Sequence, residues 1–156
     1  MPIAIRPTAI GRVAIAEEGG RIVRVHLPNR APRSSPRDAE SDLLREAFRQ
    51  LNDYLAGKRT VFDLPLDARG TPFQRAVWRE LGKIPYGAVA TYRDIAVAVG
   101  SPKGFRAVGQ ANHRNPIPLF IPCHRVIATG GGLGGFGGGL ALKETLLGIE
   151  QRSCER

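Results

Sequence analysis

The sequence has little of the residue types that build cross-linked or membrane-spanning proteins. Of its 156 residues two are cysteines, Cys123 and Cys154. Two cysteines cannot form a disulfide framework, so a reducing compartment is expected. No apolar run approaches the roughly 20 residues that a membrane-spanning helix needs, and Met1 to Arg6 lack the basic-then-apolar layout of a secretory signal. We therefore expect a cytoplasmic globular protein.

Acidic residues are scarce as well, with 14 against 23 lysines and arginines, which gives a formal net charge of +9. Between residues 68 and 142 the only acidic residues are Glu80 and Asp94, so the positive charge is concentrated in the second half. This distribution favours a polyanionic partner, either nucleic acid or an acidic membrane surface. Charge that serves solubility alone is the alternative.

The glycine-rich stretch 130–139 does not provide a nucleotide-binding motif. Gly130, Gly132 and Gly135 fit the G-x-G-x-x-G spacing, with Glu150 twenty residues further on. A glycine tract fits that spacing trivially, too little chain remains to complete a βαβ unit, and there is no Gly-Lys-Ser/Thr. We expect no nucleotide cofactor.

Residues 1–66 are predicted to form a small domain of sheet and helix without catalytic features. The β-like runs are Ile3 to Arg6, Arg12 to Ala16 and Arg21 to Leu27, with a hairpin turn at Glu18-Gly19-Gly20. A helical spacing from Pro36 onward predicts a helix of about five turns that ends near Gly57 and buries Leu44, Phe48, Leu51 and Leu55. Alternation over 61–66 predicts one more strand, which Pro65 places at an edge.

Residues 67–156 are predicted to form the second domain, which begins with three short helices. Thr71 with Gln74, and Thr91 with Asp94, have the spacing of capping boxes, and the two helices should end at Gly82 and Gly100. Ser101-Pro102 is expected to cap a third helix that runs to about His113. Residues expected in the core are Phe73, Val77, Trp78, Leu81, Phe105 and Val108.

The second and third of these helices, joined by a Gly-Ser-Pro turn, form a helix-turn-helix candidate. The later helix and its end carry Lys103, Arg106 and Arg114, next to small residues that allow a partner surface to approach closely. An ordinary αα-hairpin within a core is the alternative. The local excess of positive charge favours contact with DNA.

Cys123 lies at the end of a stiff segment in which Pro116, Pro118 and Pro122 hold the backbone extended. It is followed by His124 and Arg125, and cationic neighbours lower a thiol pKa and favour the nucleophilic thiolate. Adjacent side chains do not normally face each other, so Cys123 and His124 can cooperate only across a turn or through a water. The alternative is a buried, inert cysteine.

The last predicted helix, about Gly139 to Glu150, places Glu150 on the same face as Leu142, Leu146 and Leu147. A carboxylate on an apolar face needs a partner. His124 would suit, which gives a Glu–His–Cys relay in which the acid orients the imidazole. A terminal glutamate exposed to solvent is the alternative.

The block Pro122-Cys123-His124-Arg125-Val126, with Asn115-Pro116 before it and the glycine-rich turn and Leu140 to Glu144 after it, closely resembles the O6-alkylguanine-DNA alkyltransferase family. The resemblance runs from about Thr71 to Glu150 and includes Ile84 to Gly87, Thr91-Tyr92 and Arg106 to Gly109. It implies an α+β protein. A small N-terminal antiparallel sheet with a helix, ribonuclease H-like and matching only in layout, would pack on a winged-helix-like helix-turn-helix alkyltransferase domain.

The resemblance also implies a mechanism. The helix-turn-helix would bind the minor groove of double-stranded DNA, and Arg106 would fill the gap left by a flipped-out guanine. Tyr92 would rotate the nucleotide phosphate and donate a proton to the guanine ring. Cys123, activated through water and His124 held by Glu150, would attack the O6-alkyl carbon and keep the alkyl group. Asn115 would tie the active-site turn to the recognition helix. Each molecule would react once, without a cofactor and as a monomer.

Further positions follow from the same resemblance. The DNA-binding residues implied are Arg93, Lys103, Arg106, Ala107, Gly109 and Thr129, and the substrate loop comprises Val126, Phe136 and Gly137. Phe136 replaces a common tyrosine and Gly137 a common serine, which leaves the preference among alkyl groups open. No cysteine precedes Cys123, so the zinc site of some members is not expected.

Two other functions remain open at this point. One is a non-enzymatic DNA-binding or damage-sensing protein of the same fold, although the non-catalytic branch of the family has tryptophan in place of the reactive cysteine. The other is a Cys–His hydrolase, which would leave the basic helix-turn-helix unexplained.

Overall fold

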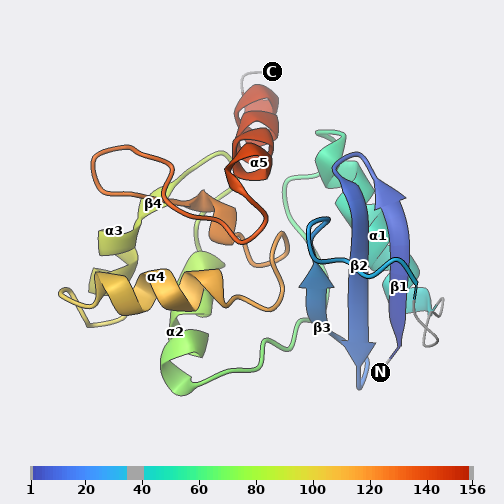
Figure 1. The fold of residues 1–156 in the computed structure, drawn as a ribbon, viewed down its shortest axis with the longest axis horizontal. Coiled ribbons are helices and arrows are strands. Elements are labelled where there is room, and N and C mark those ends of the chain that lie inside the picture. The colour runs from blue at the N-terminus through green and yellow to red at the C-terminus, as the bar shows by residue number, and fades with distance from the viewer. Residues whose placement is uncertain (1, 35–40, 155–156) are drawn as a thin grey trace. The chain divides into compact units, whose positions relative to one another are not determined.

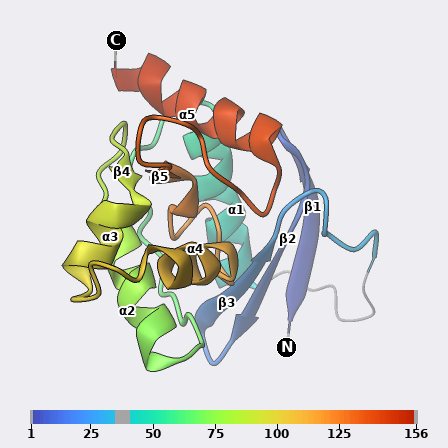
Figure 2. The ribbon, with the colours of Figure 1, turned by 60° about the vertical axis from the view of Figure 1, so that its left-hand side comes forward.

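A computed structural model describes residues 2–34 and 41–154 of the chain. The chain divides into two compact units, Met1–Asp67 and Ala68–Arg156. The first holds an antiparallel sheet and a helix and the second is mainly helical, which confirms the α+β class (Figures 1 and 2). No helix in the two described ranges has the length and the apolar composition needed to cross a bilayer.

The first unit is a three-stranded antiparallel sheet covered by one helix. Its strands are β1 (Ile3–Thr8), β2 (Gly11–Glu18) and β3 (Arg21–His26), in the order β1-β2-β3. Gly19 and Gly20 join β2 to β3 with positive φ angles of 61° and 76°. A tight hairpin requires this backbone, so the predicted turn is confirmed.

Helix α1 (Asp42–Leu55) packs on β1 and β2. The Ser41 side chain accepts a hydrogen bond from Leu44 N and caps the helix. The four apolar residues predicted for its inner face are all buried. The helix has 14 residues, about four turns. It is shorter than predicted, and the expected start at Pro36 lies outside the described residues.

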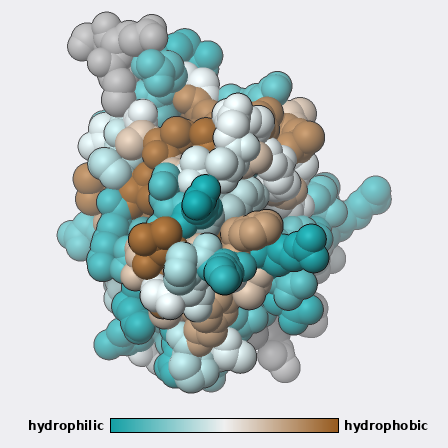
Figure 3. Space-filling model, turned by 90° about the vertical axis from the view of Figure 1, so that its left-hand side faces the viewer, coloured by the Kyte–Doolittle hydropathy of each residue, from teal (hydrophilic) through white to brown (hydrophobic). Residues whose placement is uncertain are grey.

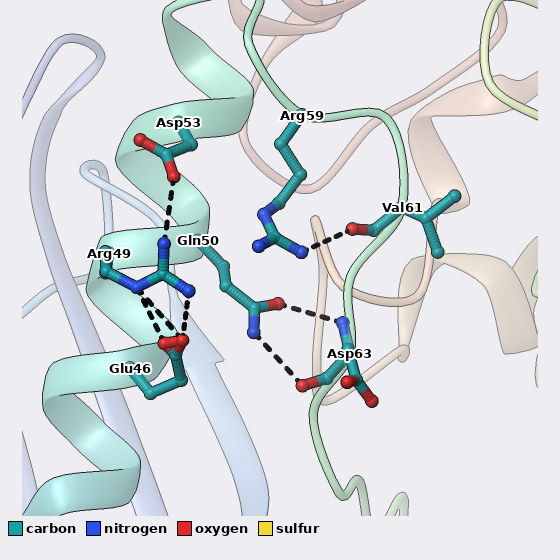
Figure 4. Close-up of polar contacts among 7 residues, drawn as sticks. All are labelled: Glu46, Arg49, Gln50, Asp53, Arg59, Val61 and Asp63. Carbon is teal, nitrogen blue, oxygen red and sulfur yellow. Dashed lines mark hydrogen bonds and ion pairs between the residues drawn. The ribbon is translucent and has the colours of Figure 1, made fainter.

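The strand predicted over 61–66 is wrong. This segment makes a single parallel bridge from Leu66 to Ile22 at the edge of β3. Pro65 has no N–H, so the run cannot extend a ladder of hydrogen bonds. The segment is fixed by Gln50 instead, whose amide donates to Asp63 O (3.1 Å) and accepts from Asp63 N (2.9 Å), beside the surface pairs of Arg49 (Figure 4).

The second unit begins with three helices that contact one another: α2 (Pro72–Leu81), α3 (Tyr92–Ala98) and α4 (Phe105–His113). Both predicted capping boxes, at Thr71 and Thr91, are present. Trp78 is buried as expected, and its Nε1 donates to Ala111 O at 2.8 Å. This bond ties α2 to α4, so the face of α4 opposite Ala111 is left for other partners.

Helix α4 starts later than predicted. Ser101 N bonds Ala96 O and closes α3, and Gly104 N bonds Ser101 O to form a turn. Gly104 is the N-cap and provides no side-chain oxygen. Ser101 therefore ends one helix instead of starting the next. Phe105, expected in the core, becomes the first residue of α4 and is 52% exposed.

A parallel pair of two-residue strands organises the rest of the unit. Strand β4 (Ala90–Thr91) pairs with β5 (Val126–Ile127), which follows the 3-10 turn η1 (Cys123–Arg125). Because α3 begins directly after β4, this pairing brings the start of α3 beside the turn that carries Cys123. Helix α5 (Leu140–Cys154) contacts η1.

The buried face of α5 differs from the prediction. Lys143, Leu146 and Glu150 are buried, whereas Leu142 and Leu147 are only partly so. The helix continues one turn beyond Glu150, the predicted end. Two charged side chains on an inward-facing stripe indicate that α5 does more than fill a core.

Candidate active site

Cys123 is buried at the end of the proline-rich segment and begins the turn η1. Asn115 shapes this segment from within: its Nδ2 donates to Ile121 O at 2.9 Å and its Oδ1 accepts from Ile117 N at 3.0 Å. Asn115 follows Arg114, the C-cap residue of α4. The two bonds therefore fix the path from α4 to the thiol.

Behind the thiol lies a buried ion-pair cluster. The Glu150 carboxylate is 1% exposed and contacts His124 Nε2 at 2.7 Å through Oε2. Arg125 Nε donates to Glu150 Oε1 at 2.8 Å, and Gly87 N donates to the same oxygen at 3.2 Å. Arg125 Nη1 also donates to Ile84 O at 2.8 Å. The structure thus brings His124 and Glu150 together, as the sequence pattern predicts.

Arg125 as a partner of Glu150 was not expected from the sequence. Its guanidinium also lies over the Tyr86 ring, 5.7 Å from the centroid. One carboxylate therefore balances the buried arginine and orients the imidazole. The signal in the sequence was an arginine directly after the Cys-His pair, which needs a counter-charge if the turn is buried.

The resting thiol is neutral, contrary to expectation. Burial raises the pKa of Cys123 to about 11, although the Asn115 amide and the Lys143 ammonium act in the opposite direction. Arg125 does not help the thiolate because Glu150 and the Ile84 carbonyl take up its charge. Burial likewise lowers the pKa of His124, against the opposing effect of Glu150, so the imidazole is neutral at pH 7. A neutral imidazole can accept a proton.

A cavity of about 260 Å³ in the second unit is connected to this turn through Asn112. Its lining residues come from α3, α4 and the glycine-rich loop, residues 128–139, and comprise Tyr92, Gly109, Asn112, His113, Gly135, Phe136 and Gly137. The Tyr92 hydroxyl donates to Gly135 O at 3.5 Å, and burial raises the Tyr92 pKa. Asn112 links the cavity to the thiol residue, since its Nδ2 donates to Cys123 O at 3.4 Å. Asn112 and His113 were not among the site residues predicted from the sequence.

Lys143 is a third unpredicted site residue. Its ammonium is buried and donates to the carbonyls of Val126 (2.6 Å), Leu133 and Gly135 (3.1 Å). One side chain therefore ties β5 to two points of the glycine-rich loop. Burial lowers its pKa. The sequence held a clue in the spacing Lys143, Leu146, Glu150, which is three and then four residues.

A second hollow of about 320 Å³ lies on the outer side of α4, and its lining residues are Tyr92, Phe105, Gly109, Ala128 and Thr129. Of the predicted DNA-binding residues, Arg93, Lys103, Arg106, Ala107 and Thr129 are exposed, and Gly109 is partly so. On this face of the second unit, hydrophilic, hydrophobic and intermediate residues are interspersed (Figure 3). Of the predicted substrate loop, Phe136 and Gly137 line the cavity, whereas Val126 is buried and contributes its carbonyl to Lys143.

Both units match protein families with known members. The protein-family model described as 6-O-methylguanine DNA methyltransferase, DNA binding domain, matches residues 72–152, and that of the ribonuclease-like domain matches residues 4–68. The chain is 47% identical over 153 residues to the constitutive methylated-DNA–protein-cysteine methyltransferase of Bacillus subtilis, covering 94% of this chain and 93% of that protein. It is 53% identical over 109 residues to the methylated-DNA–protein-cysteine methyltransferase of Methanosarcina barkeri, covering 70% and 69%.

A crystal structure of Mycobacterium tuberculosis OGT in complex with DNA superimposes with a TM-score of 0.90 at 38% identity, covering 98% of this chain and 94% of that chain. The fold and the sequence therefore indicate the same family. The resemblance carried by the Pro-Cys-His-Arg-Val block is confirmed, and this chain belongs to the 6-O-methylguanine DNA methyltransferase family.

Proposed function

We propose that this protein repairs DNA by moving the O6-alkyl group of a guanine onto the Sγ atom of Cys123. The observation that carries the proposal is the buried contact of 2.7 Å between His124, the residue that follows the cysteine, and Glu150. A neutral imidazole oriented by a carboxylate can accept the proton of the neighbouring thiol through a water.

The chemical step is an in-line displacement at the alkyl carbon. The bond from Sγ to carbon forms as the bond from carbon to O6 breaks. The thiol proton passes through a water to His124, and Tyr92 donates a proton to the ring of the departing guanine. The product is a thioether, which has no easy leaving group, so each molecule reacts once and needs no cofactor.

Double-stranded DNA is the partner because its phosphates match the basic second unit. Exposed Arg106 on α4 would occupy the place of the flipped guanine from the minor groove. Arg93, Lys103 and Thr129 would bind the phosphate backbone of the DNA. Ala107 and Gly109 allow the groove to approach α4 closely. A reactive thiol acting on DNA fits a reducing cytoplasm.

The test is the mass of the protein after incubation with duplex DNA that contains one O6-methylguanine. We expect one added methyl group, on the peptide that contains Cys123, with saturation at one per molecule. Cys123→Ala should lose the transfer and keep most of the DNA affinity, and that affinity should fall steeply with salt. An unchanged mass despite tight binding would identify a damage-sensing protein. Turnover on a small ester without alkylation would identify a hydrolase.

A further inference from the structure

Asn112 has an oxygen atom that nothing in the described part of the protein satisfies. Its side chain is on the inner face of α4 and is 4% exposed. The Nδ2 atom donates to Cys123 O, while the buried Oδ1 atom receives no hydrogen bond from residues 2–34 or 41–154. Buried side-chain acceptors are nearly always paired, so this atom calls for a specific explanation.

The orientation of the carboxamide is set by its surroundings. The Cys123 carbonyl can only accept, so the nitrogen of Asn112 must face it and the oxygen must take the other position. Asn112 also borders the cavity of about 260 Å³. The described residues offer Oδ1 no hydrogen bond, so a molecule that displaces water from this cavity can supply the donor.

The cavity wall around Asn112 leaves room for such a molecule. Gly109, one turn earlier on α4, has no side chain, and a Cβ atom there would lie 3.9 Å from the Tyr92 ring. The remaining lining residues are Tyr92, His113, Gly135, Phe136 and Gly137. Most of the lining offers aromatic or backbone surface, and the Asn112 amide is a polar group fixed in orientation within it.

The chemistry of the proposed substrate supplies one matching donor. Guanine has two kinds of N–H on its pairing edge, the ring N1–H and the exocyclic 2-amino group. Alkylation at O6 removes the proton from N1, so the 2-amino group is the only N–H donor left on the base. The side-chain oxygen of Asn112, unpaired among the described residues, thus has one kind of matching donor on the base.

We propose that Asn112 Oδ1 accepts a hydrogen bond from the 2-amino group of the O6-alkylguanine and makes the site selective for guanine among O6-alkylated purines. The inference rests on the proposed function and adds a specificity-determining residue to it. An alkylated base without this amino group leaves the Asn112 oxygen unpaired, and a site built to pair a polar group rejects ligands that lack the partner.

The test compares two duplexes that differ only in the 2-amino group: one contains O6-methylguanine and the other O6-methylhypoxanthine. Single-turnover rates of methyl transfer to Cys123 are measured for the wild type, for Asn112→Leu, which is close in volume and has no acceptor, and for Asn112→Asp, which keeps an acceptor. Asn52→Leu makes the same change on the exposed face of α1 and serves as the matched control.

We expect the wild type and Asn52→Leu to favour O6-methylguanine by at least about tenfold, the equivalent of one hydrogen bond. Asn112→Leu should bring the ratio close to one and Asn112→Asp should retain it. A purely structural role would lower both rates together and leave the ratio unchanged in Asn112→Leu, which would overturn the inference. If Asn112→Leu does not fold, the wild-type ratio decides, since equal rates on the two duplexes also overturn it. No transfer from O6-methylguanine to the wild type would instead refute the proposed function itself.

Discussion

Gly134 lies so close to Tyr92 that a Cβ atom at residue 134 would stand 2.9 Å from the tyrosine hydroxyl oxygen. Gly134 also has a φ of 70°, which side chains disfavour. The glycine-rich loop can therefore approach the Tyr92 ring only where the chain lacks a side chain. This contact joins the loop to α3 at one wall of the cavity.

Gly134→Ala should separate the loop from Tyr92. The added methyl group forces a shift of the ring or the loop, and misplacement of a reacting group by about 1 Å can cost about a hundredfold in rate. We expect a loss of this order in the methyl-transfer rate, measured by single-turnover kinetics. Gly131→Ala is the control, because Gly131 has a φ of 95° and nothing within 4 Å of a Cβ atom. Equal losses in the two variants would mean that backbone strain alone is responsible.

Lys143→Met should loosen the glycine-rich loop. Methionine preserves the packing of the stem but removes the donor that three carbonyls share, among them the buried Val126 carbonyl, at a cost of about 2 kcal/mol in the free energy of unfolding. We expect faster amide hydrogen exchange over residues 128–139 and a slower transfer rate. Lys83→Met, at a lysine exposed on the surface, should change neither. Unchanged exchange in Lys143→Met would show that the loop is held by other contacts.

Glu150→Gln should be strongly destabilising. It removes the charge that balances Arg125 in a buried site, and the loss of one partner of a buried pair costs about 4 kcal/mol. Urea unfolding measures the loss, and Glu144→Gln, at an exposed position of the same helix, should stay within about 0.5 kcal/mol of the wild type. A small loss in Glu150→Gln would indicate that Arg125 is satisfied by Ile84 O and the Tyr86 ring.

Stability at alkaline pH should report on the thiol. In the folded protein the pKa of Cys123 is raised from 9.0 to about 11, so between these values the unfolded chain loses a proton that the folded protein keeps. The contribution of the neutral thiol is complete below pH 9 and is lost as the pH rises toward 11. Urea unfolding should therefore show the wild type losing stability relative to Cys123→Ser across this range. A constant difference between the two proteins would contradict the raised pKa.

The sequence predicts those parts of the structure that depend on local chemistry. The capping boxes at Thr71 and Thr91 and the hairpin at Gly19-Gly20 follow from hydrogen bonds and φ angles within a few residues. The contact of His124 with Glu150 is predictable because a carboxylate at an apolar position requires a partner. These features need no knowledge of how distant segments meet.

The features that the sequence did not predict depend on distant segments. Lys143 looks like an exposed helical lysine until the three carbonyls it binds are placed around it. The raised Cys123 pKa depends on burial and on Glu150 taking up the charge of Arg125, neither of which a cationic tripeptide reveals. Phe105 was assigned to the core from its apolar character, but Ser101 closes α3 and so moves the start of α4 to Phe105.

The burial of Cys123 also affects how the protein withstands its chemical surroundings. A protein that can react only once is lost whenever its thiol meets an oxidant or a soluble alkylating agent. Such reagents attack thiolates far faster than thiols, and a pKa of about 11 leaves very little thiolate at pH 7. The same burial that makes the thiol a poor general nucleophile therefore protects it from these reagents until an alkylated base is bound.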